Sequence, residues 1–583
     1  MKMRIACFVL LAANLISPFS LSSAQNRASV FDEIRRDHEW IEKNLHKRAP
    51  AKSLFPEAVA ALTQSVDVKH YRLQIRLNLN APAIAGTVTI EGEALTRTSE
   101  INIDAQANLI IDAVRFDGAP VDFRHKKDLI KLDFSAPILA GSKFAIAIDY
   151  HGTPVVLGRL GGGMLVSRHG SDDNPVMASL SEPFAAPSWW PCIDDARDKA
   201  TAEIEATVPA GYQAASNGVL VKTESNANQT ATFFWREDFP LSTYLVSIAA
   251  TNYAKFEDTY TALDGTVMPL IYYVYPEHLA IAQQKFAITR RAMEIFAPLF
   301  GEYPFISEKY GMAEFPWSGG MEHQTLTSLG SNVVGSSGTS QSIIAHELAH
   351  QWWGDLVTLR TWDDIWLNEG FATYAEVLFF ERFSSLNAGE LMSDSYDDGK
   401  MSGRLGGTVT AEDPDDPFDD TGAVYTKGAW VLHMLRHMMG DQAFFDALKD
   451  YRQRFAYGNA STSDFQRVCE DHYGAKLDWF FTQWIYAEGR PSYKVSTDVG
   501  APDTGTGFTL RVTIKQKQTQ SIPGRSESVF IMPLDVTITY GDGQTEKRVV
   551  INDARKQTFT FNIAKLPVRV EVDKDNWVLK KLK

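Results

Sequence analysis

The hydrophobic and polar positions follow two different periods along the chain. From about residue 65 apolar residues alternate with polar ones, first at Tyr71, Leu73, Ile75, Leu77 and Leu79. Similar short runs follow at residues 87–92, 101–104, 129–134 and 144–150, and an apolar stretch at residues 244–250 ends the series. Turn signals such as Asp117-Gly118 and Ala140-Gly141 separate the runs. A period of two broken by turns predicts an antiparallel β domain over residues 58–255.

A helical period replaces the alternation between about residues 277 and 488. Apolar residues recur three and four positions apart over residues 278–300, 341–355, 366–383, 426–439 and 441–455. A strand-like stretch at residues 310–315 precedes the pair Gly319-Gly320. The mixture predicts a second domain, rich in helices, over residues 256–496.

Alternation returns near the end of the chain. Residues 497–506 combine Gly, Pro, Asp and Thr and are expected to form a linker. Alternating runs then follow at residues 508–515, 534–540, 548–551, 558–563 and 568–572. A small β-sandwich is therefore predicted over residues 497–583.

The first residues carry the pattern of a targeting signal. Lys2 and Arg4 precede a mostly apolar run at residues 5–16, and Ser22-Ser23-Ala24 offers a small-residue cleavage site. The run is too short to span a bilayer as a lone anchor, although a retained anchor stays an alternative. We therefore expect a signal peptide at residues 1–24, cleavage near Ala24, and a secreted or periplasmic protein.

Residues 25–57 are expected to form an N-terminal helical extension. Within it, residues 26–49 read as one amphipathic helix with Val30, Ile34, Ile41 and Leu45 near one stripe. The apolar stripe should pack on the outside of a later domain, and a partner-binding role is the alternative.

Composition narrows the classes of partner. The 583 residues imply several domains, and the net charge of −15 argues against nucleic acid or an anionic membrane surface as a partner. No later segment has eighteen uninterrupted apolar residues, so no stable membrane insertion is expected after signal removal. Cys192 and Cys469 lie far apart in what look like different domains, so two buried free thiols are expected rather than a disulfide. The oligomeric state is not predicted.

The strongest chemical signal is His346-Glu347-Leu-Ala-His350, with Glu369 following after eighteen intervening residues. On a helix, His346 and His350 lie one turn apart on one face, so both imidazoles can reach a single zinc ion. Glu347 can then act on a water as general base, and Glu369 is the obvious third ligand. Two histidines on a helix can also be ordinary surface residues, but apolar neighbours such as Trp352 and Trp353 indicate a buried helix. Burying these groups without a cation would be costly.

Further segments resemble one family. They are Gly319-Gly320-Met321-Glu322-His323, Tyr425-Thr426-Lys427-Gly428, Ser181-Glu182-Pro183, Trp190-Pro191-Cys192 and Pro240-Leu241-Ser242-Thr243-Tyr244. In this order, from about residue 65 to 495, the chain resembles the aminopeptidase N family of gluzincins, which includes leukotriene hydrolase. The resemblance implies a multidomain α+β protein: a β saddle domain, a thermolysin-like catalytic domain and a small β-sandwich. The large helical C-terminal domain of many members is expected to be absent.

The resemblance also implies roles for individual residues. His346, His350 and Glu369 match the ligands of one Zn²⁺ per chain, and Glu347 matches the general base. Tyr425 matches the tyrosine that stabilises the oxyanion, a task that a neutral phenol can perform.

Glu322 and Glu182 match the residues that bind the free amino group of a peptide, while Gly319, Gly320 and Met321 match the substrate-binding strand. His323 replaces the usual Asn, which puts the geometry of the amine site and its pH dependence in question.

These features predict a zinc aminopeptidase acting on peptides with a free N-terminus. Two alternatives remain open. Without a helical cover the same site could serve a zinc endopeptidase or an epoxide hydrolase. Alternatively, the chain could be a non-catalytic scaffold of the same fold, although every expected catalytic group is present. The preferred N-terminal residue and the physiological substrate are not predicted.

Overall fold

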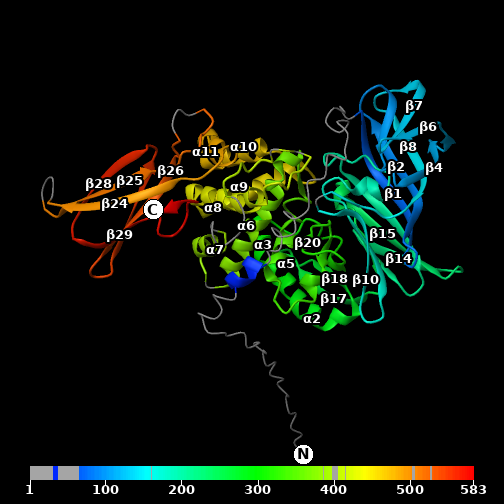
Figure 1. Cartoon of the computed structure of the whole chain (residues 1–583), viewed down its shortest axis with the longest axis horizontal. Helices are drawn as coiled ribbons and strands as arrows, with labels where there is room; N and C mark the ends of the chain where they lie inside the picture. Colours follow the sequence, from blue (N-terminus) through cyan, green and yellow to red (C-terminus); the bar gives the residue numbers. More distant parts are fainter. Residues whose placement is uncertain are drawn as a thin grey trace, which may run out of the picture.

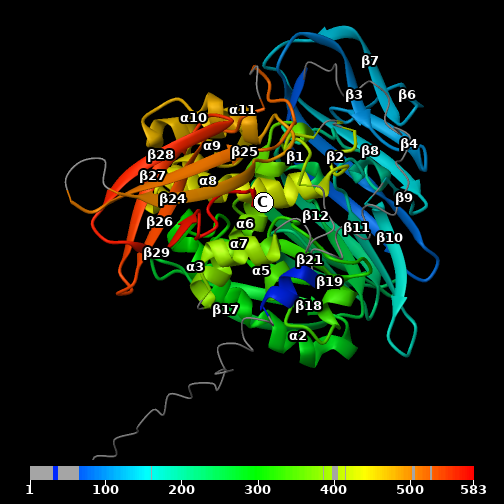
Figure 2. The same cartoon turned by 60° about the vertical axis from the view of Figure 1, so that its left-hand side comes forward.

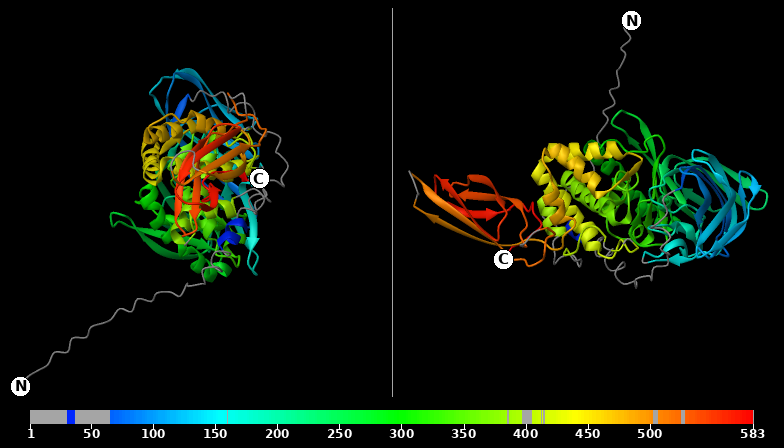
Figure 3. Two further views of the ribbon diagram at one scale, coloured as in Figure 1. Left: turned by 90° about the vertical axis from the view of Figure 1, so that its left-hand side faces the viewer. Right: turned by 90° about the horizontal axis from the view of Figure 1, so that it is seen from above.

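The computed structural model describes residues 30–36 and 65–582, except residues 159, 385, 397–404, 412, 414, 502–505 and 525–527. The predicted signal peptide and most of the N-terminal extension therefore lie outside the described residues. Three units lie in a row along the longest axis, with the helix-rich unit between two β units (Figure 1, Figure 3). This arrangement confirms the multidomain α+β fold that the sequence predicted.

The N-terminal β unit contains three sheets. The largest has the order β14 (Val219–Asn226), β15 (Thr230–Leu241), β12 (Ala200–Pro209), β1 (Val66–Asn78), β2 (Ala83–Ala94), β8 (Lys143–Gly152), β4 (Leu109–Phe116) and β5 (Ala119–Pro120). The second has the order β13 (Gln213–Ser216), β16 (Ile248–Thr251), β11 (Asn174–Leu180), β10 (Gly162–His169) and β9 (Val156–Leu157). The third consists of β3 (Thr98–Asp104), β7 (Leu129–Ile138) and β6 (Phe123–Lys126).

The alternation seen in the sequence corresponds to burial. In β1 the side chains of Tyr71, Leu73, Ile75 and Leu77 are all 3% exposed or less, while the residues between them face outward. Each such side chain contributes roughly 1.5–3 kcal/mol relative to full exposure. One part of the prediction is wrong, because β1 and β12 are parallel neighbours in an otherwise antiparallel sheet. The long stretch of chain between them, β2 to β11, removes the directional constraint that a tight hairpin would impose.

The middle unit places one sheet against a set of helices. Its sheet has the order β17 (Ala254–Thr261), β18 (Val267–Val274), β19 (Tyr310–Phe315), β21 (Leu326–Gly330) and β20 (Gly320–Met321), so β20 is an edge strand. Its helices are α2 (Leu279–Phe286), α3 (Ile288–Phe300), α4 (Ser331–Val334), α5 (Gln341–Ala349), α6 (Trp366–Phe383), α7 (Ala388–Ser395), α8 (Gly428–Met439), α9 (Asp441–Phe455), α10 (Thr462–Tyr473) and α11 (Asp478–Trp484). A short parallel pair joins β22 (Val357–Leu359) to β23 (Gly458–Ala460).

Helix boundaries agree with the sequence where the apolar period is long. The predicted bounds of α6, α9 and β19 are those of the structure. The predicted helix over residues 278–300 is divided at Ala287 into α2 and α3, although no Gly or Pro marks the break. Helix α5 ends earlier than predicted because the chain turns after His350, where the N–H of Asp355 donates to the His350 carbonyl.

The C-terminal unit is the predicted β-sandwich. One sheet has the order β28 (Lys556–Ile563), β25 (Phe508–Gln516), β24 (Ser492–Gly500) and β30 (Lys581–Leu582), and the other β27 (Thr545–Asn552), β26 (Met532–Tyr540) and β29 (Pro567–Val572). The linker predicted at residues 497–506 is wrong for its first part, because residues 497–500 belong to β24. Backbone pairing with β25, from Tyr493 opposite Gln516 to Gly500 opposite Thr509, outweighs the weak strand propensity of these residues.

A short N-terminal helix packs against the middle unit. Residues 30–36 are helical and lie beside α5 (Figure 2). Val30 and Ile34 are buried, as the predicted apolar stripe requires, whereas Ile41 and Leu45 lie outside the described residues. The expected packing on a later domain is thus confirmed for the described part of this helix.

The structure also bears on the predictions about the cysteines and about membrane-spanning helices. Cys192 and Cys469 are buried and free, which confirms two unpaired thiols. Among the described residues, no helix combines the length and apolar character needed to cross a bilayer.

Candidate metal centre and active-site cleft

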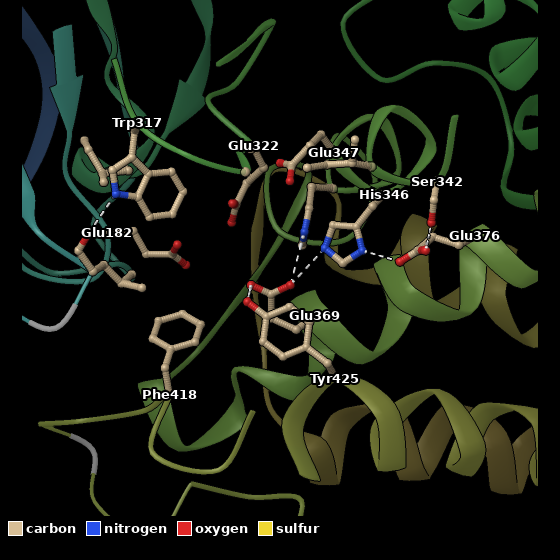
Figure 4. Close-up of a pocket in the computed structure, with 16 residues that line it drawn as sticks. Glu182, Trp317, Glu322, Ser342, His346, Glu347, Glu369, Glu376, Phe418 and Tyr425 are labelled. Carbon is tan, nitrogen blue, oxygen red and sulfur yellow. Dashed lines mark hydrogen bonds and ion pairs between the residues drawn. The ribbon is translucent and has the colours of Figure 1, made fainter. Parts of the chain in front are cut away.

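Two packed helices supply the candidate metal ligands. Helix α5 carries His346 and Glu347, and His350 follows at its C-terminal cap with helical backbone angles. Helix α6 runs alongside and presents Glu369 from its first turn. All four side chains are nearly inaccessible to solvent. His346 and Glu369 face each other across the space between the two helices (Figure 4).

The three predicted ligands meet as the sequence required. Oε2 of Glu369 lies 3.1 Å from Nε2 of His346 and 3.4 Å from Nε2 of His350. One ligand atom from each residue lies within 4.8 Å of the others, the spacing that one metal ion can bridge. The structure thus brings together the predicted set of two imidazoles and one carboxylate.

Each imidazole is held by the nitrogen that faces away from the centre. Nδ1 of His346 lies 2.8 Å from Oε1 of Glu376, and Nδ1 of His350 lies 3.0 Å from the Trp353 carbonyl. A carbonyl can only accept, so Nδ1 of His350 carries a hydrogen and donates it to Trp353, which leaves Nε2 as the nitrogen that faces the centre. The Glu376 carboxylate orients His346 in the same way.

This arrangement fits a zinc ion. Burial opposes protonation of the two imidazoles, yet the carboxylates around them raise the pKa of His350 to about 10 and that of His346 well above its usual value. The site therefore favours positive charge between these groups, which a zinc ion can supply. Burial opposes ionisation, yet the pKa of Glu369 is lowered to about 2 because His350 and His346 favour its charged form. Two imidazoles and one carboxylate are ligands that zinc prefers in a catalytic site.

Tyr425 reaches the centre from a π-helical turn, η6 (Gly422–Lys427), that leads into α8. Its hydroxyl donates to Oε1 of Glu369 over 2.8 Å, and burial raises the pKa of the phenol well above its usual value. The backbones of α6 and α8 approach each other closely here because both contact residues are glycines: a Cβ on Gly370 would lie 3.0 Å from the Gly428 Cα. The tyrosine therefore stays a neutral donor beside the metal ligands.

Two further carboxylates lie in the same cleft. Glu182 follows β11 of the N-terminal unit and Glu322 follows β20 of the middle unit, and both are buried. Oε1 of each side chain is buried without a hydrogen-bond partner, and so is Oε2 of Glu347. Burial raises the pKa of Glu182, and the charge of Glu322 raises it further. Buried carboxylate oxygens without partners mark a place for a cationic ligand.

The glycine motif forms one edge of the cleft. Gly319 and Gly320 line it, and a Cβ on Gly320 would lie only 2.3 Å from Oε1 of Glu347. Met321 and His323 do not contribute to the cleft lining, and their predicted contact with substrate stays a prediction. Glu322, which stands between them just after β20, does line the cleft.

His323 also differs from the expectation about pH. Burial lowers the pKa of its imidazole to about 3, so the ring is neutral at neutral pH. Its Nδ1 lies 2.8 Å from the Ser328 hydroxyl on β21, which gives the ring a structural hydrogen bond.

Several lining residues were not identified from the sequence. The further walls of the cleft are Leu160, Leu180, Trp317 and Phe418. Glu376, which orients His346, stands seven positions after Glu369 in an apolar helix, and this spacing on one helix face is a signal that sequence reading could have used. Phe418 lies in an acidic segment that precedes Tyr425, and no local pattern in the sequence points to its place in the cleft.

Comparisons with known proteins agree with this geometry. A profile of the Peptidase family M1 domain matches residues 284–484, and a profile of the Peptidase M1 N-terminal domain matches residues 67–245. The chain belongs to the M1 peptidase family. The two matched ranges contain all of the candidate ligands as well as Glu182, so the family assignment covers both sides of the cleft.

Relatives of this M1 peptidase have aminopeptidase names. It is 29% identical over 376 residues to glutamyl aminopeptidase of Rattus norvegicus, covering 58% of this chain and 39% of the rat protein. It is 25% identical over 417 residues to leucyl aminopeptidase of Saccharolobus solfataricus, covering 68% of this chain and 50% of that protein. The chain thus spans half or less of the length of these curated relatives.

Solved structures share the fold. An M1 zinc metallopeptidase from Deinococcus radiodurans superposes with a TM-score of 0.65 at 26% identity, covering 74% of this chain and 96% of that one. Aminopeptidase A from Legionella pneumophila gives a TM-score of 0.74 at 18% identity over 90% of this chain and 60% of that one, which shows the fold alone.

Proposed function

We propose that this protein is a zinc aminopeptidase that hydrolyses the first peptide bond of peptides with a free N-terminus. The observation that carries the proposal is the pair Glu182 and Glu322, whose unpartnered buried oxygens share one cleft with the three metal ligands. His346, His350 and Glu369 would hold one Zn²⁺ per chain. When bound there, zinc polarises a carbonyl and lowers the pKa of a water to about 7.

Glu347 is the proposed general base. Its side chain lines the cleft. One ligand atom of Glu347 lies within 4.8 Å of a ligand atom of Glu322 and of one of His350, so the carboxylate is close to the metal position. The carboxylate takes one proton from the attacking water and passes it to the leaving amine nitrogen as the C–N bond breaks. The water oxygen and its second hydrogen remain on the acyl carbon, so the products are a free amino acid and a shortened peptide.

Tyr425 is the proposed donor to the oxyanion. The attack places negative charge on the carbonyl oxygen, and a phenol that stays protonated can donate a hydrogen bond to it. Its present partner, Oε1 of Glu369, shows that the hydroxyl already points into the centre.

Glu182 and Glu322 are proposed to bind the α-ammonium group of the substrate. A positive group held at a fixed place relative to the metal ligands allows only the first peptide bond to reach them. Gly319 and Gly320 would let the peptide backbone approach the free edge at β20. The relatives' names, glutamyl and leucyl aminopeptidase, imply the same reaction but different first residues.

A panel of aminoacyl p-nitroanilides tests the reaction with wild-type protein and Glu347→Gln. We expect cleavage that requires zinc and that falls by at least about 100-fold in the variant, the lower end of the usual range for a general base, with zinc content unchanged. A matched pair of peptides, one free and one N-acetylated, tests the amine site. Equal cleavage of the two peptides would refute the roles of Glu182 and Glu322 and favour an endopeptidase.

We also propose that the protein is exported, because of the signal-like pattern in residues 1–24. Mass spectrometry of the protein from its native host should then find Gln25 as the first residue. A mature chain that keeps residues 1–24 would contradict cleavage near Ala24.

A further inference from the structure

The wall of the cleft next to Glu182 is apolar. Trp317 and Phe418 lie on either side of the Glu182 carboxylate, away from the metal ligands (Figure 4). Leu160 and Leu180 complete this wall, and Leu180 is fully buried. An α-ammonium bound at Glu182 and Glu322 would therefore bring the first side chain of the peptide against two aromatic rings and two leucines.

The aromatic walls are held in place by the surrounding structure. The indole Nε1–H of Trp317 donates to the Leu160 carbonyl over 3.0 Å, which ties a loop of the middle unit to the N-terminal unit. Phe418 is 2% exposed, and its ring centroid lies 6.5 Å from that of Tyr425. The apolar surface is therefore a built wall and does not need to form when the substrate arrives.

Apart from the two imidazoles at the metal position, the ionisable side chains of the cleft lining are carboxyl groups and Tyr425. The lining contains the carboxylates of Glu182, Glu322, Glu347, Glu369 and Glu376, and within the described residues no lysine or arginine lines the cleft. Zinc and the α-ammonium group of the substrate can offset the negative charges of these carboxylates. No further cation then remains to pair with the carboxylate of a substrate whose first residue is Asp or Glu. An acidic side chain would thus be desolvated among like charges.

We propose that this cleft selects peptides whose first residue is apolar or aromatic, and that it rejects those beginning with Asp or Glu. This inference rests on the proposed aminopeptidase function and names its substrate class. Trp317 and Phe418 are the residues that determine it, through contact with the side chain of the first residue.

Ratios of kcat/KM within one enzyme preparation test the selection. With Phe-, Leu-, Ala-, Lys- and Glu-p-nitroanilide, we expect the Phe and Leu substrates to exceed Ala, and Glu to fall below Ala. Phe418→Ala should lower the Leu/Ala ratio by about tenfold, the lower end of the usual effect of one methylene-sized contact in an apolar pocket. Trp317→Phe, which keeps a ring but loses the bond to Leu160, provides a milder second variant.

The outcomes separate this inference from the proposed function. No cleavage of any substrate by zinc-loaded protein would refute the aminopeptidase function itself. Cleavage with Glu or Lys preferred over Leu would overturn only the selection. An unchanged Leu/Ala ratio in both variants would overturn the role of the two rings, because the ratio does not depend on the fraction of active protein.

A separate observation concerns the start of the metal-binding helix. Ser340, at the N-cap of α5, has a left-handed backbone (φ 57°), and its side chain makes no capping bond. Its hydroxyl instead donates to the Val333 carbonyl. The cap is supplied by Glu33 of the N-terminal helix, whose Oε1 accepts the Gln341 N–H over 2.5 Å and whose Oε2 accepts the Thr339 hydroxyl.

This cap is connected to a metal ligand. Ser342, the next residue of α5, donates its hydroxyl to Oε2 of Glu376, and Oε1 of Glu376 lies 2.8 Å from Nδ1 of His346. Ordering the first turn of α5 therefore also fixes the side chain that orients His346. Val30 and Ile34, both buried, anchor the helix that carries Glu33.

We propose that Glu33 is a positioning residue for the metal site and that the N-terminal helix slows the loss of zinc. Negative charge at a helix N-terminus and a satisfied first-turn N–H both stabilise the helical turn. The helix 30–36 is then a part of the metal centre that lies outside both matched family domains.

The test measures zinc release from the full-length holoprotein to a chromophoric chelator, without any peptide substrate. We expect Glu33→Ala to release zinc about fivefold faster than wild type. Losing an N-cap changes the folding equilibrium of a helix by about 2- to 30-fold, and fivefold lies within this range. Glu33→Gln keeps an acceptor oxygen but loses the charge, so its rate should be intermediate.

Asp32→Asn is the matched control. Asp32 stands on the same helix, is 62% exposed and pairs only locally with Arg35 among the contacts of the described residues. Its loss should leave zinc release unchanged. If both Glu33 variants release zinc at the rate of Asp32→Asn, the proposed role of Glu33 is wrong, even if their melting temperatures fall. That result would leave the aminopeptidase function untouched.

Discussion

Replacing Tyr425 by phenylalanine removes one hydroxyl from the centre and leaves the ring in place. That hydroxyl donates to Oε1 of Glu369 over 2.8 Å, and burial raises the pKa of the phenol well above its usual value. At any working pH it therefore carries its proton. In the proposed reaction it donates this hydrogen bond to the developing oxyanion, so the change removes a donor that acts mainly in the transition state.

The expected magnitude follows from this role. Removing one oxyanion donor costs about 100- to 1,000-fold in kcat, or roughly 2.7–4 kcal/mol. A neutral substrate carbonyl gains much less from the same donor, so KM should stay within about threefold. Glu369 loses one accepted hydrogen bond but keeps its place beside His346 and His350, so zinc should remain bound.

Steady-state kinetics on a leucyl p-nitroanilide, with the zinc content of each preparation measured, tests this prediction. Tyr374→Phe is a matched control, because Tyr374 is also a buried tyrosine but bonds to His433 at 3.2 Å, remote from the cleft lining. It should retain wild-type kcat. A Tyr425→Phe enzyme with full zinc and a kcat within about threefold of wild type would refute the assignment. A fall in activity matched by lost zinc would mean that Tyr425 acts through Glu369.

Three other changes give distinct results. Gly320→Ala would place a Cβ 2.3 Å from Oε1 of Glu347, so kcat should fall at least about tenfold with zinc retained; wild-type kcat would show that Glu347 can move freely. Glu376→Gln should weaken zinc binding about 10- to 100-fold in chelator competition, and unchanged affinity would contradict its hold on His346. Burial lowers the pKa of Lys427 from about 10.5 to about 7. Between pH 7 and pH 10.5 the unfolded chain therefore binds more protons than the folded protein. The free energy of unfolding should rise by up to about 1.4 kcal/mol per pH unit across that window. Lys427→Met should flatten this rise in urea titrations at pH 7.5, 8.5 and 9.5, and parallel curves for both proteins would refute it.

The metal site was predictable because its information is local. His346 and His350 are one helical turn apart, so a helix alone brings them to one face. Helix α6 has an uninterrupted apolar period, and its predicted bounds place Glu369 in the first turn. The alternation in β1 likewise specifies which residues are buried. In each case the local sequence pattern determines which side chains share one face of the element, and tertiary packing keeps that face buried.

The rest depends on contacts between segments that are distant in sequence. Phe418 and Leu160 meet at the cleft only through the packing of two units, and Glu33 caps α5 across more than three hundred residues. The orientation of His323 depends on its pairing partner β21, which a motif does not reveal. The direction of β12 beside β1 was missed for the same reason, since it is set by tertiary packing and not by a turn.

The proposed selectivity for a free N-terminus depends on how two units meet. The metal ligands all belong to the middle unit, whereas Glu182 comes from the N-terminal unit. Two hydrogen bonds fix this interface: Nζ of Lys199 donates to the Asp355 carbonyl over 2.7 Å, and Nδ2 of the buried Asn217 donates to the Gln324 carbonyl over 2.6 Å. Both acceptors lie within five residues of a cleft residue, His350 or Glu322. A change that loosens this interface should therefore impair the discrimination between free and acetylated peptides before it impairs zinc binding.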